Sequence, residues 1–230
     1  MGSEMCIRDR TGEAVLRAAD IAVPRDPSSA AFPMVAALLT PASDITIPRI
    51  GMNPLRTGLI TTLQEMGGDI TLSNERTEGG EAVADLRVRH SHLHGIDVPA
   101  ARAASMIDEY PILAIAATQA EGVTRMHGVS ELRVKETDRI AVVADGIDAA
   151  GGSVIYDEDS MTVTGGNIAG GVTIASQHDH RIAMSFLTLG MVSDAAITVT
   201  GCMTINTSFP DFATLMNGCG AALAAAGGDT

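Results

Sequence analysis

Residues 96–128 read IDVPAARAASMIDEYPILAIAATQAEGVTRMHG, and the order of elements in this segment predicts the fold class. It indicates a short β-branched strand at IDVP, an acidic turn at Asp108, an alanine-rich helix near 109–118 and a second strand at GVTRMHG. A second helix, from about Lys135 to Ala150, and two further strands complete the pattern. This order of elements predicts a β-α-β-α-β-β unit.

The same order of elements occurs on either side of this unit. An earlier copy opens at IAVP, residues 21–24, and a later copy opens at VTIAS, residues 172–176. The openings lie about 75 residues apart, and regular spacing with a common order of elements indicates an internal repeat. The later copy stops after its second helix, so we expect its missing strand from residues N-terminal to this chain. The sequence therefore predicts an α/β (α+β) fold of repeated β-α-β-α-β-β units that is N-terminally truncated.

The composition is typical of a globular protein. The chain has 230 residues, 46% of them hydrophobic, which suffices to bury a sizeable core. A formal net charge of −13 argues against a nucleic-acid surface, because such surfaces take their affinity from Lys and Arg. The cysteines lack metal-ligand spacing, and we find neither a bilayer-spanning apolar stretch nor a signal peptide. We expect a cytoplasmic protein that binds neither nucleic acid nor membrane. The first ten residues, MGSEMCIRDR, do not fit the repeat and are excluded from this prediction.

The basic residues are most informative in RVKETDR, residues 133–139. All basic residues of the chain are arginine except Lys135, which lies in this stretch. Lys135 and Arg139 are four residues apart, which places them on one face of the expected helix, where an anion between them would offset their repulsion. A surface ion pair between Glu136 and Arg139 explains the spacing equally well. The local concentration of cations favours an anion site.

An aspartate precedes the first helix of each copy: Asp26, Asp108 and Asp179. Each would cap its helix by accepting backbone N–H bonds, and three converging helix N-termini would also favour anions. The stretch HDHR, residues 178–181, offers His and Asp side chains to a metal, but no further ligand has compatible spacing, so we predict no metal site. Arg181 is instead suited to bind a carboxylate or phosphate in bidentate fashion.

Four ordered motifs resemble the 5-enolpyruvylshikimate-3-phosphate synthase family. They are IDEYPILAIAA (107–117), ELRVKETDRI (131–140), DHRIAMSF (179–186) and TSFPDF (207–212). The segments DPSSAAFP, MNPLRTGLI and DEYP resemble the glyphosate-insensitive class of that family. The resemblance implies a two-domain enolpyruvyl transferase-like fold, in which residues 11–71 would be the last unit of the first domain. Residues 72–230 would form the second domain except for one strand.

The resemblance also implies a reaction. Members of the family transfer the enolpyruvyl group of phosphoenolpyruvate to the 5-hydroxyl of shikimate 3-phosphate and release phosphate, without a metal or organic cofactor. On the matching positions, Asp108 would accept the proton of the attacking hydroxyl, and Glu136 would handle the proton at the methylene carbon. The substrate-binding residues would be Ser29, Lys135, Arg139, His180 and Arg181. Of these, Lys135 and Ser29 would contact shikimate 3-phosphate and the two arginines would hold phosphoenolpyruvate, although helix capping explains Ser29 nearly as well. We expect a monomer.

Some features of the family have no counterpart in this sequence. Its Lys-Ser and Arg substrate contacts, its Asn-Ser-Gly loop and a further arginine would lie N-terminal to this chain, so the chain alone is expected to be inactive. Arg25 replaces the glycine that the family usually has before DPSS, which indicates a sequence error or a strained turn. Thr207 replaces a lysine of the glyphosate-sensitive class. Two alternatives stay open: a related enolpyruvyl transferase that acts on UDP-N-acetylglucosamine, and a non-catalytic anion-binding module.

Overall fold

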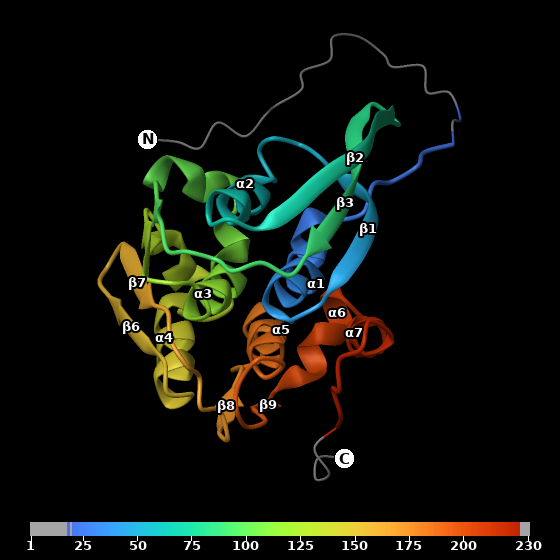
Figure 1. Ribbon diagram of the computed structural model, residues 1–230. Coiled ribbons are helices and arrows are strands. Elements are labelled where there is room, and N and C mark those ends of the chain that lie inside the picture. Colours follow the sequence, from blue (N-terminus) through green and yellow to red (C-terminus); the bar gives the residue numbers. More distant parts are fainter. Residues whose placement is uncertain (1–17, 19, 226–230) are drawn as a thin grey trace.

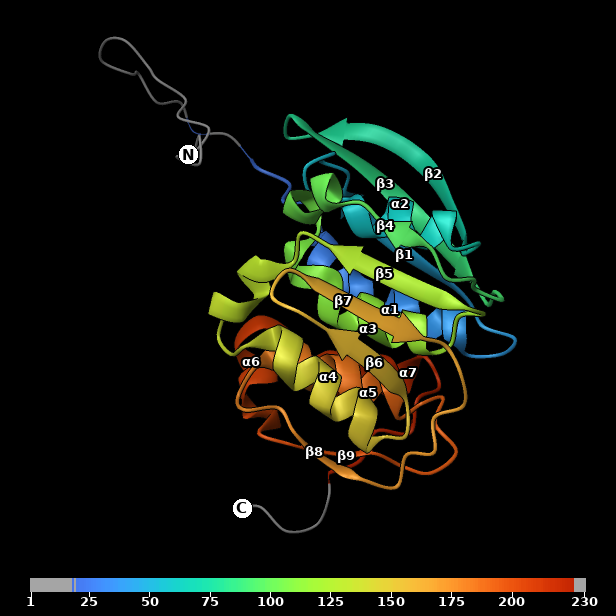
Figure 2. The ribbon, with the colours of Figure 1, turned by 90° about the vertical axis from the view of Figure 1, so that its left-hand side faces the viewer.

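Three similar units surround a bundle of three buried helices (Figure 1). The computed structural model describes residue 18 and residues 20–225. Helices α1 (Pro27–Leu39), α3 (Tyr110–Thr118) and α5 (His180–Leu189) lie at the centre, with the small sheets outside them. In Figure 2 the sheets of the three units follow one another from top to bottom. The predicted α/β fold of repeated units is confirmed.

The first unit follows the predicted order of elements. After α1 come β1 (Asp44–Gly51), α2 (Gly58–Glu65), β2 (Asp69–Glu78) and β3 (Glu81–Arg89). Strand β3 lies between β1 and β2 and is antiparallel to both. The opening strand is reduced to one parallel bridge between Arg25 and Ile50. Arg25 does not have a positive φ, so the strained turn that we considered for this residue is wrong.

The second unit is the most complete. Its sheet has the order β4-β5-β7-β6, in which β4 and β5 are parallel and the other neighbours antiparallel. The elements are β4 (Asp97–Val98), the 3-10 helices η1 (Ala100–Ser105) and η2 (Ile107–Glu109), α3, β5 (Val123–His127), the 3-10 helix η3 (Ser130–Val134), α4 (Arg139–Ala149), β6 (Ser153–Tyr156) and β7 (Ser160–Thr164).

The third unit has a smaller sheet. Strands β8 (Thr173–Ala175) and β9 (Thr198–Thr200) are parallel, as β4 and β5 are, and α5 connects them. The 3-10 helix η4 (Cys202–Thr204) and the helices α6 (Ile205–Ser208) and α7 (Phe212–Gly218) follow. No third strand pairs with β9 in the described part of the chain, whereas β5 pairs with β7 at the corresponding edge. That a strand from elsewhere completes this sheet stays a prediction.

The core is continuous across all three units. Every residue of α3 is buried, and α1 and α5 pack against it and against each other. Burial on all sides is typical of a helix at the centre of a domain, and the alanines of α1 and α3 allow close approach. One apolar cluster extends from Ala30 in α1 to Met216 in α7. This packing fixes the N-terminal ends of the three helices relative to one another.

The domain boundary expected between residues 71 and 72 lies inside strand β2. This strand pairs with β3 on both sides of that position, from Asp69 opposite Arg89 to Glu78 opposite Glu81. The apolar core also includes residues from both sides, such as Leu63 and Leu113. We therefore propose that residues 20–225 form a single domain of three units.

Local side-chain hydrogen bonds set the first residue of two helices. Helix α2 begins at Gly58, after a turn in which the side chain of Asn53 accepts the N–H of Leu55. Helix α4 begins at Arg139 rather than at Lys135, because Asp138 caps it by accepting the N–H of Ala141 at 3.1 Å. Lys135 and Arg139 therefore do not share a helical face, and that prediction is wrong.

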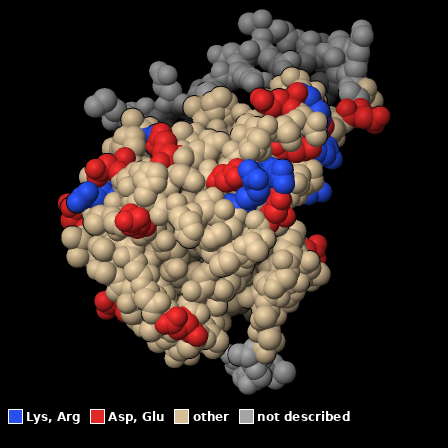
Figure 3. All heavy atoms as spheres, viewed as in Figure 1, with Lys and Arg blue, Asp and Glu red and all other residues tan. Residues whose placement is uncertain are grey.

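Basic side chains on the surface are largely paired with carboxylates. In the face of the molecule that Figure 3 shows, Lys and Arg lie beside Asp and Glu. An example is the pair Arg87 and Asp44, whose Nη2 and Oδ2 atoms are 2.6 Å apart. Within residues 20–225, no helix is both long and apolar enough to cross a membrane.

Candidate active site

The charged residues singled out in the sequence come together where α3, α4 and α5 begin. Asp108 lies in η2, directly before α3, and Arg139 is the first residue of α4. Arg181 is the second residue of α5, and Lys135 follows η3. All four side chains meet at Asp108, which has Lys135, Arg139 and Arg181 as ion-pair partners. The structure thus brings charged groups of the second and third units to one place.

Arg139 is the buried centre of this cluster, with a side chain that is only 1% exposed. Its Nε donates to Oδ2 of Asp179 at 2.7 Å, and its Nη1 donates to Oδ1 of Asp108 at 3.0 Å. Its Nη2 donates to Glu136. A buried guanidinium is stable only when carboxylates compensate its charge, and here three carboxylates do so.

Asp108 differs from the other two aspartates at the helix starts. Asp26 accepts the N–H groups of Ser28 and Ser29, and Asp179 accepts those of Arg181 and Ile182, so both cap helices as predicted. Asp108 accepts no backbone N–H in this way, and the prediction that it caps α3 is wrong. Burial would raise the pKa of Asp108, but the charges of Arg181, Lys135 and Arg139 outweigh burial and lower it. The carboxylate is therefore ionised at neutral pH and free of a capping role.

Lys135 reaches the cluster from the end of η3. Its Nζ lies 2.7 Å from Oε1 of Glu131 and 3.5 Å from Oδ1 of Asp108. Burial would lower the pKa of Lys135, but the hydrogen bond that Lys135 donates to Glu131 and the charge of Asp108 raise it. The ammonium group thus stays charged beside Asp108, although Lys135 lies before α4 and not within the helix that was predicted to carry it.

Arg181 is held by the segment that contains Asp108. Its Nη1 donates to the backbone oxygen of Asp108 at 3.1 Å and to Oε1 of Glu109 at 3.3 Å. Burial raises the pKa of Glu109, and the nearby Ser28 hydroxyl and Arg181 charge oppose this effect only in part. The side chain of Glu109 is 5% exposed, so a second carboxylate lies buried beside Asp108.

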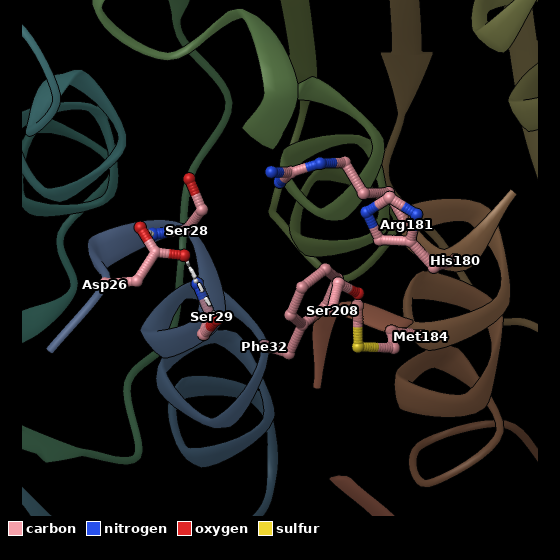
Figure 4. A pocket seen from close by; sticks show the side chains of 8 residues that line it. All are labelled: Asp26, Ser28, Ser29, Phe32, His180, Arg181, Met184 and Ser208. Atoms are coloured by element: carbon pink, nitrogen blue, oxygen red, sulfur yellow. Dashed lines mark hydrogen bonds between the residues drawn. The ribbon is translucent and has the colours of Figure 1, made fainter. Parts of the chain in front are cut away.

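His180 and Ser29 face a small pocket between the beginnings of α1 and α5. Figure 4 shows the pocket, which has a volume of about 50 Å³. Ser29 donates its hydroxyl to Asp26 at 3.1 Å, so it takes part in the capping of α1. Burial lowers the pKa of His180, and the charge of Arg181 adds to this effect. The substrate contacts predicted for Ser29 and His180 stay predictions. The pocket is lined by Asp26, Ser28, Ser29, Phe32, His180, Arg181, Met184 and Ser208.

The sequence did not indicate Glu109 or Arg56 as residues of this region, and it did not indicate that Asp179 binds Arg139. Glu109 pairs with Arg181, Asp179 binds Arg139 as well as capping α5, and Arg56 donates to the hydroxyl of Ser28 at 2.8 Å. A charged residue such as Glu109, next to a long apolar run, was a signal that could have been used. The partners of Asp179 and Arg56 are far away in the sequence and gave no such signal.

Within the cluster, the cationic and carboxylate side chains form ion pairs with one another. Among residues 20–225, no group of three or more His, Cys, Asp or Glu side chains is arranged to hold a metal ion. The cluster contains three cations, namely Lys135, Arg139 and Arg181, and five carboxylates, namely Asp108, Glu109, Glu131, Glu136 and Asp179. Because the carboxylates outnumber the cations, the cluster as a whole does not carry the net positive charge that would attract an anion.

Comparisons with known proteins relate this chain to one family. A sequence model described as EPSP synthase (3-phosphoshikimate 1-carboxyvinyltransferase) matches residues 7–216. The 3-phosphoshikimate 1-carboxyvinyltransferase of Parvibaculum lavamentivorans is 60% identical over 92% of this chain and 47% of its own length. The corresponding protein of Rhodospirillum rubrum is 59% identical, again over 92% of this chain and 47% of the relative. The chain thus spans about half the length of the curated relatives it matches.

Solved structures agree with this result. EPSP synthase from Acinetobacter baumannii superposes with a TM-score of 0.84 and 46% identity, over 86% of this chain and 46% of that one. The enolpyruvyl transferase NikO from Streptomyces tendae has a TM-score of 0.67 at 16% identity, over 85% and 43% of the two chains, and supports the fold alone. The repeated units, the cluster around Asp108 and these matches lead to one conclusion: the chain belongs to the EPSP synthase family.

Proposed function

We propose that this chain supplies one side of the active site of an enzyme that transfers the enolpyruvyl group of phosphoenolpyruvate to the 5-hydroxyl of shikimate 3-phosphate, with release of phosphate. The observation that carries the proposal is the ionised Asp108, which is surrounded by Lys135, Arg139 and Arg181. A carboxylate among cations is suited to chemistry between two anionic substrates, because the cations can bind phosphate and carboxylate groups.

Asp108 is proposed to accept the proton of the attacking hydroxyl. The three cations lower its pKa, which keeps it ionised and able to accept a proton at neutral pH. Its side chain is 35% exposed, so a substrate can reach it. Glu136, whose side chain is 51% exposed, is proposed to handle the proton at the methylene carbon of phosphoenolpyruvate.

We propose that different cations of the cluster bind the two substrates. Lys135 would contact shikimate 3-phosphate, whereas Arg139 and Arg181 would hold phosphoenolpyruvate. Arg139 already donates to three carboxylates, so an anion must compete with Asp108 or Glu136 for its N–H groups. Because carboxylates outnumber cations here, additional positive charge from another part of the whole protein would favour binding of both anions. Ser29 and His180 are proposed to contact substrate in the adjoining pocket.

The proposal includes the setting of the enzyme. We propose that the whole protein works as a monomer in the cytoplasm, on small molecules rather than on nucleic acid or membranes, and without a cofactor. Of this setting, the surface ion pairs support only the lack of nucleic-acid binding, because they leave few cations of residues 20–225 free for phosphate backbones.

A chimera tests the proposed reaction. Residues 18–225 of this chain would replace the matching part of the Parvibaculum lavamentivorans relative, to which the chain is 60% identical. We expect phosphate release from phosphoenolpyruvate and shikimate 3-phosphate by the chimera, and none by the 230-residue chain alone. A soluble, folded chimera that releases no phosphate would contradict the proposal. Turnover by the chain alone would show that it needs no residues from the rest of the whole protein for catalysis.

The same chimera separates the alternative functions. An enzyme for UDP-N-acetylglucosamine would release phosphate with that acceptor and not with shikimate 3-phosphate. A non-catalytic anion-binding module would bind phosphoenolpyruvate in a calorimeter but would release no phosphate with either acceptor. We expect activity with shikimate 3-phosphate only.

A further inference from the structure

Glu109 is a buried carboxylate for which the proposed chemistry has no use. It lies in η2, directly after Asp108, and is 4% exposed. Placing an ionised carboxylate in such a site is unfavourable unless it is paired. Because Glu109 lies between Asp108 and the apolar helix α3, its charge must be compensated by a hydrogen-bond donor or a cation nearby.

The partner on one side is Arg181. Oε1 of Glu109 accepts from Nη1 of Arg181 at 3.3 Å, and the backbone oxygen of Asp108 accepts from the same nitrogen at 3.1 Å. The other terminal nitrogen, Nη2, comes no closer than 3.9 Å to Oδ2 of Asp108, which is too long for a hydrogen bond. Within residues 20–225, neither Nη2 nor Nε donates a hydrogen bond. Glu109 thus holds the nitrogen Nη1 of the guanidinium and leaves the edge formed by Nη2 and Nε for a ligand.

Arg139 shows the opposite arrangement. Its Nε, Nη1 and Nη2 all donate to carboxylates, and its side chain is 1% exposed, against 14% for Arg181. Of the two arginines, only Arg181 keeps a free edge that a carboxylate or phosphate could bind in bidentate fashion. In Figure 4 the side chain of Arg181 extends from α5 across the pocket toward the start of α1, where Ser28 lies.

The partner on the other side of Glu109 is the beginning of the first unit. Helix α1, which carries the 3% exposed Ser28, packs against η2, which carries Glu109. The Ser28 hydroxyl lowers the pKa of Glu109 and so opposes the effect of burial. The oxygen of Ser28 accepts from Nη2 of Arg56 at 2.8 Å. Arg56 and Ser28 belong to the first unit, Glu109 to the second and Arg181 to the third. The carboxylate therefore connects all three units at the proposed site.

We propose that Glu109 is a positioning residue, which fixes the guanidinium of Arg181 so that its free edge faces the anionic group of the enolpyruvyl donor. This inference rests on the proposed function for the identity of the ligand, but the geometry of Arg181 can be tested without any substrate. Glu109→Gln keeps the shape of the side chain and removes its charge. Glu121→Gln is the matched control, because Glu121 is exposed and takes part only through its backbone in the pairing next to β5.

Nitrogen NMR of the full 230-residue chain measures the position of Arg181 directly. The Arg181 side-chain signals are assigned by their loss in Arg181→Lys. In the unsubstituted chain we expect two separate Nη signals, because pairing along one edge slows rotation about the Nε–Cζ bond. Glu109→Gln should merge them into one, and Glu121→Gln should not. Separate, unshifted Arg181 signals in Glu109→Gln would overturn the proposal.

Steady-state kinetics of the chimera measure how the loss of the Glu109 charge changes the binding of phosphoenolpyruvate. Loss of one hydrogen bond to a charged group should raise KM for phosphoenolpyruvate by about tenfold or more in Glu109→Gln. KM for shikimate 3-phosphate should change by less than about twofold, and the melting midpoint by less than about 4 °C. Equal changes in both KM values, or an unchanged KM for phosphoenolpyruvate, would overturn the proposal. An inactive chimera would instead count against the proposed function, and the NMR result would still decide the role of Glu109.

Discussion

His180 lies beside Arg181 at the beginning of α5 and is half-buried in the pocket. Burial is the main cause that lowers its pKa, and the charges of Arg181 and Arg139 act in the same direction. The negative charges of Asp179 and Glu136 oppose this shift of the pKa. The folded protein therefore holds His180 in its neutral form at pH values where the unfolded chain binds a proton.

This shift predicts a loss of stability in mild acid. The folded pKa lies below the unfolded value of 6.5, so the unfolded state binds more protons as the pH falls below 6.5. Urea unfolding of the chain and of His180→Asn, at about pH 7.5 and about pH 5.5, should show that the unsubstituted chain loses more stability. The difference should not exceed about 1 kcal/mol, because solvent screens a half-buried group. An identical pH response of the two proteins would contradict the shift.

The residues of the site could be predicted from the sequence only where a motif carried them. RVKETDR and HDHR pointed to Lys135, Arg139 and Arg181, and the structure brings all three to Asp108. The sequence could not predict how deeply Arg139 is buried, because its partner Asp179 is forty residues away. It also did not distinguish Asp108 from the two capping aspartates, since that difference depends on the 3-10 turn before α3.

Packing between α4 and α5 depends on a glycine in the middle of a helix. A Cβ atom at Gly146 in α4 would overlap the ring of Phe186 in α5, a side chain that is fully buried. Alanine is better than glycine in a helix interior by about 1 kcal/mol, but overpacking of a core costs about 1–3 kcal/mol. The second effect is the larger, so the glycine is required by the approach of the two helices.

A pair of glycine substitutions tests this balance. Gly146→Ala should lower the free energy of unfolding by about 1 kcal/mol or more, measured by urea denaturation. Gly218→Ala is the control, because Gly218 ends α7 and a Cβ atom there would meet nothing within 4 Å. The control should be as stable as the unsubstituted chain or more stable by up to about 1 kcal/mol. Equal stability of Gly146→Ala and the unsubstituted chain would show that α4 and α5 can move apart.

Helix and strand order could be predicted because each unit has the same periodic pattern. The helix expected near 109–118 is α3 (Tyr110–Thr118), and the strand expected at GVTRMHG is β5 (Val123–His127). Errors arose at helix starts, where local side-chain bonds decide the bounds. Asp138 caps α4 and also binds Arg133 at 2.7 Å, so residues 135–138 form a connection instead of a first turn.

The whole molecule explains why the proposed site lies where it does. Three units share one core, and their central helices begin near the same cluster of charges. The shared core could not be predicted from the repeat alone, because similar units can equally form separate domains. The division of the chain after residue 71 stays a prediction, and the pairing of β2 with β3 across that position favours the single domain that we propose.

The central claim is that the cluster around Asp108 performs enolpyruvyl transfer. Its most direct test is phosphate release from phosphoenolpyruvate and shikimate 3-phosphate by the chimera, with and without Asp108→Ala. Loss of a positioned proton acceptor should lower the rate by about 10²–10⁴-fold. The control Asp148→Ala, at an exposed position of α4, should stay within about twofold. A rate for Asp108→Ala within about threefold of the unsubstituted chimera would contradict the account.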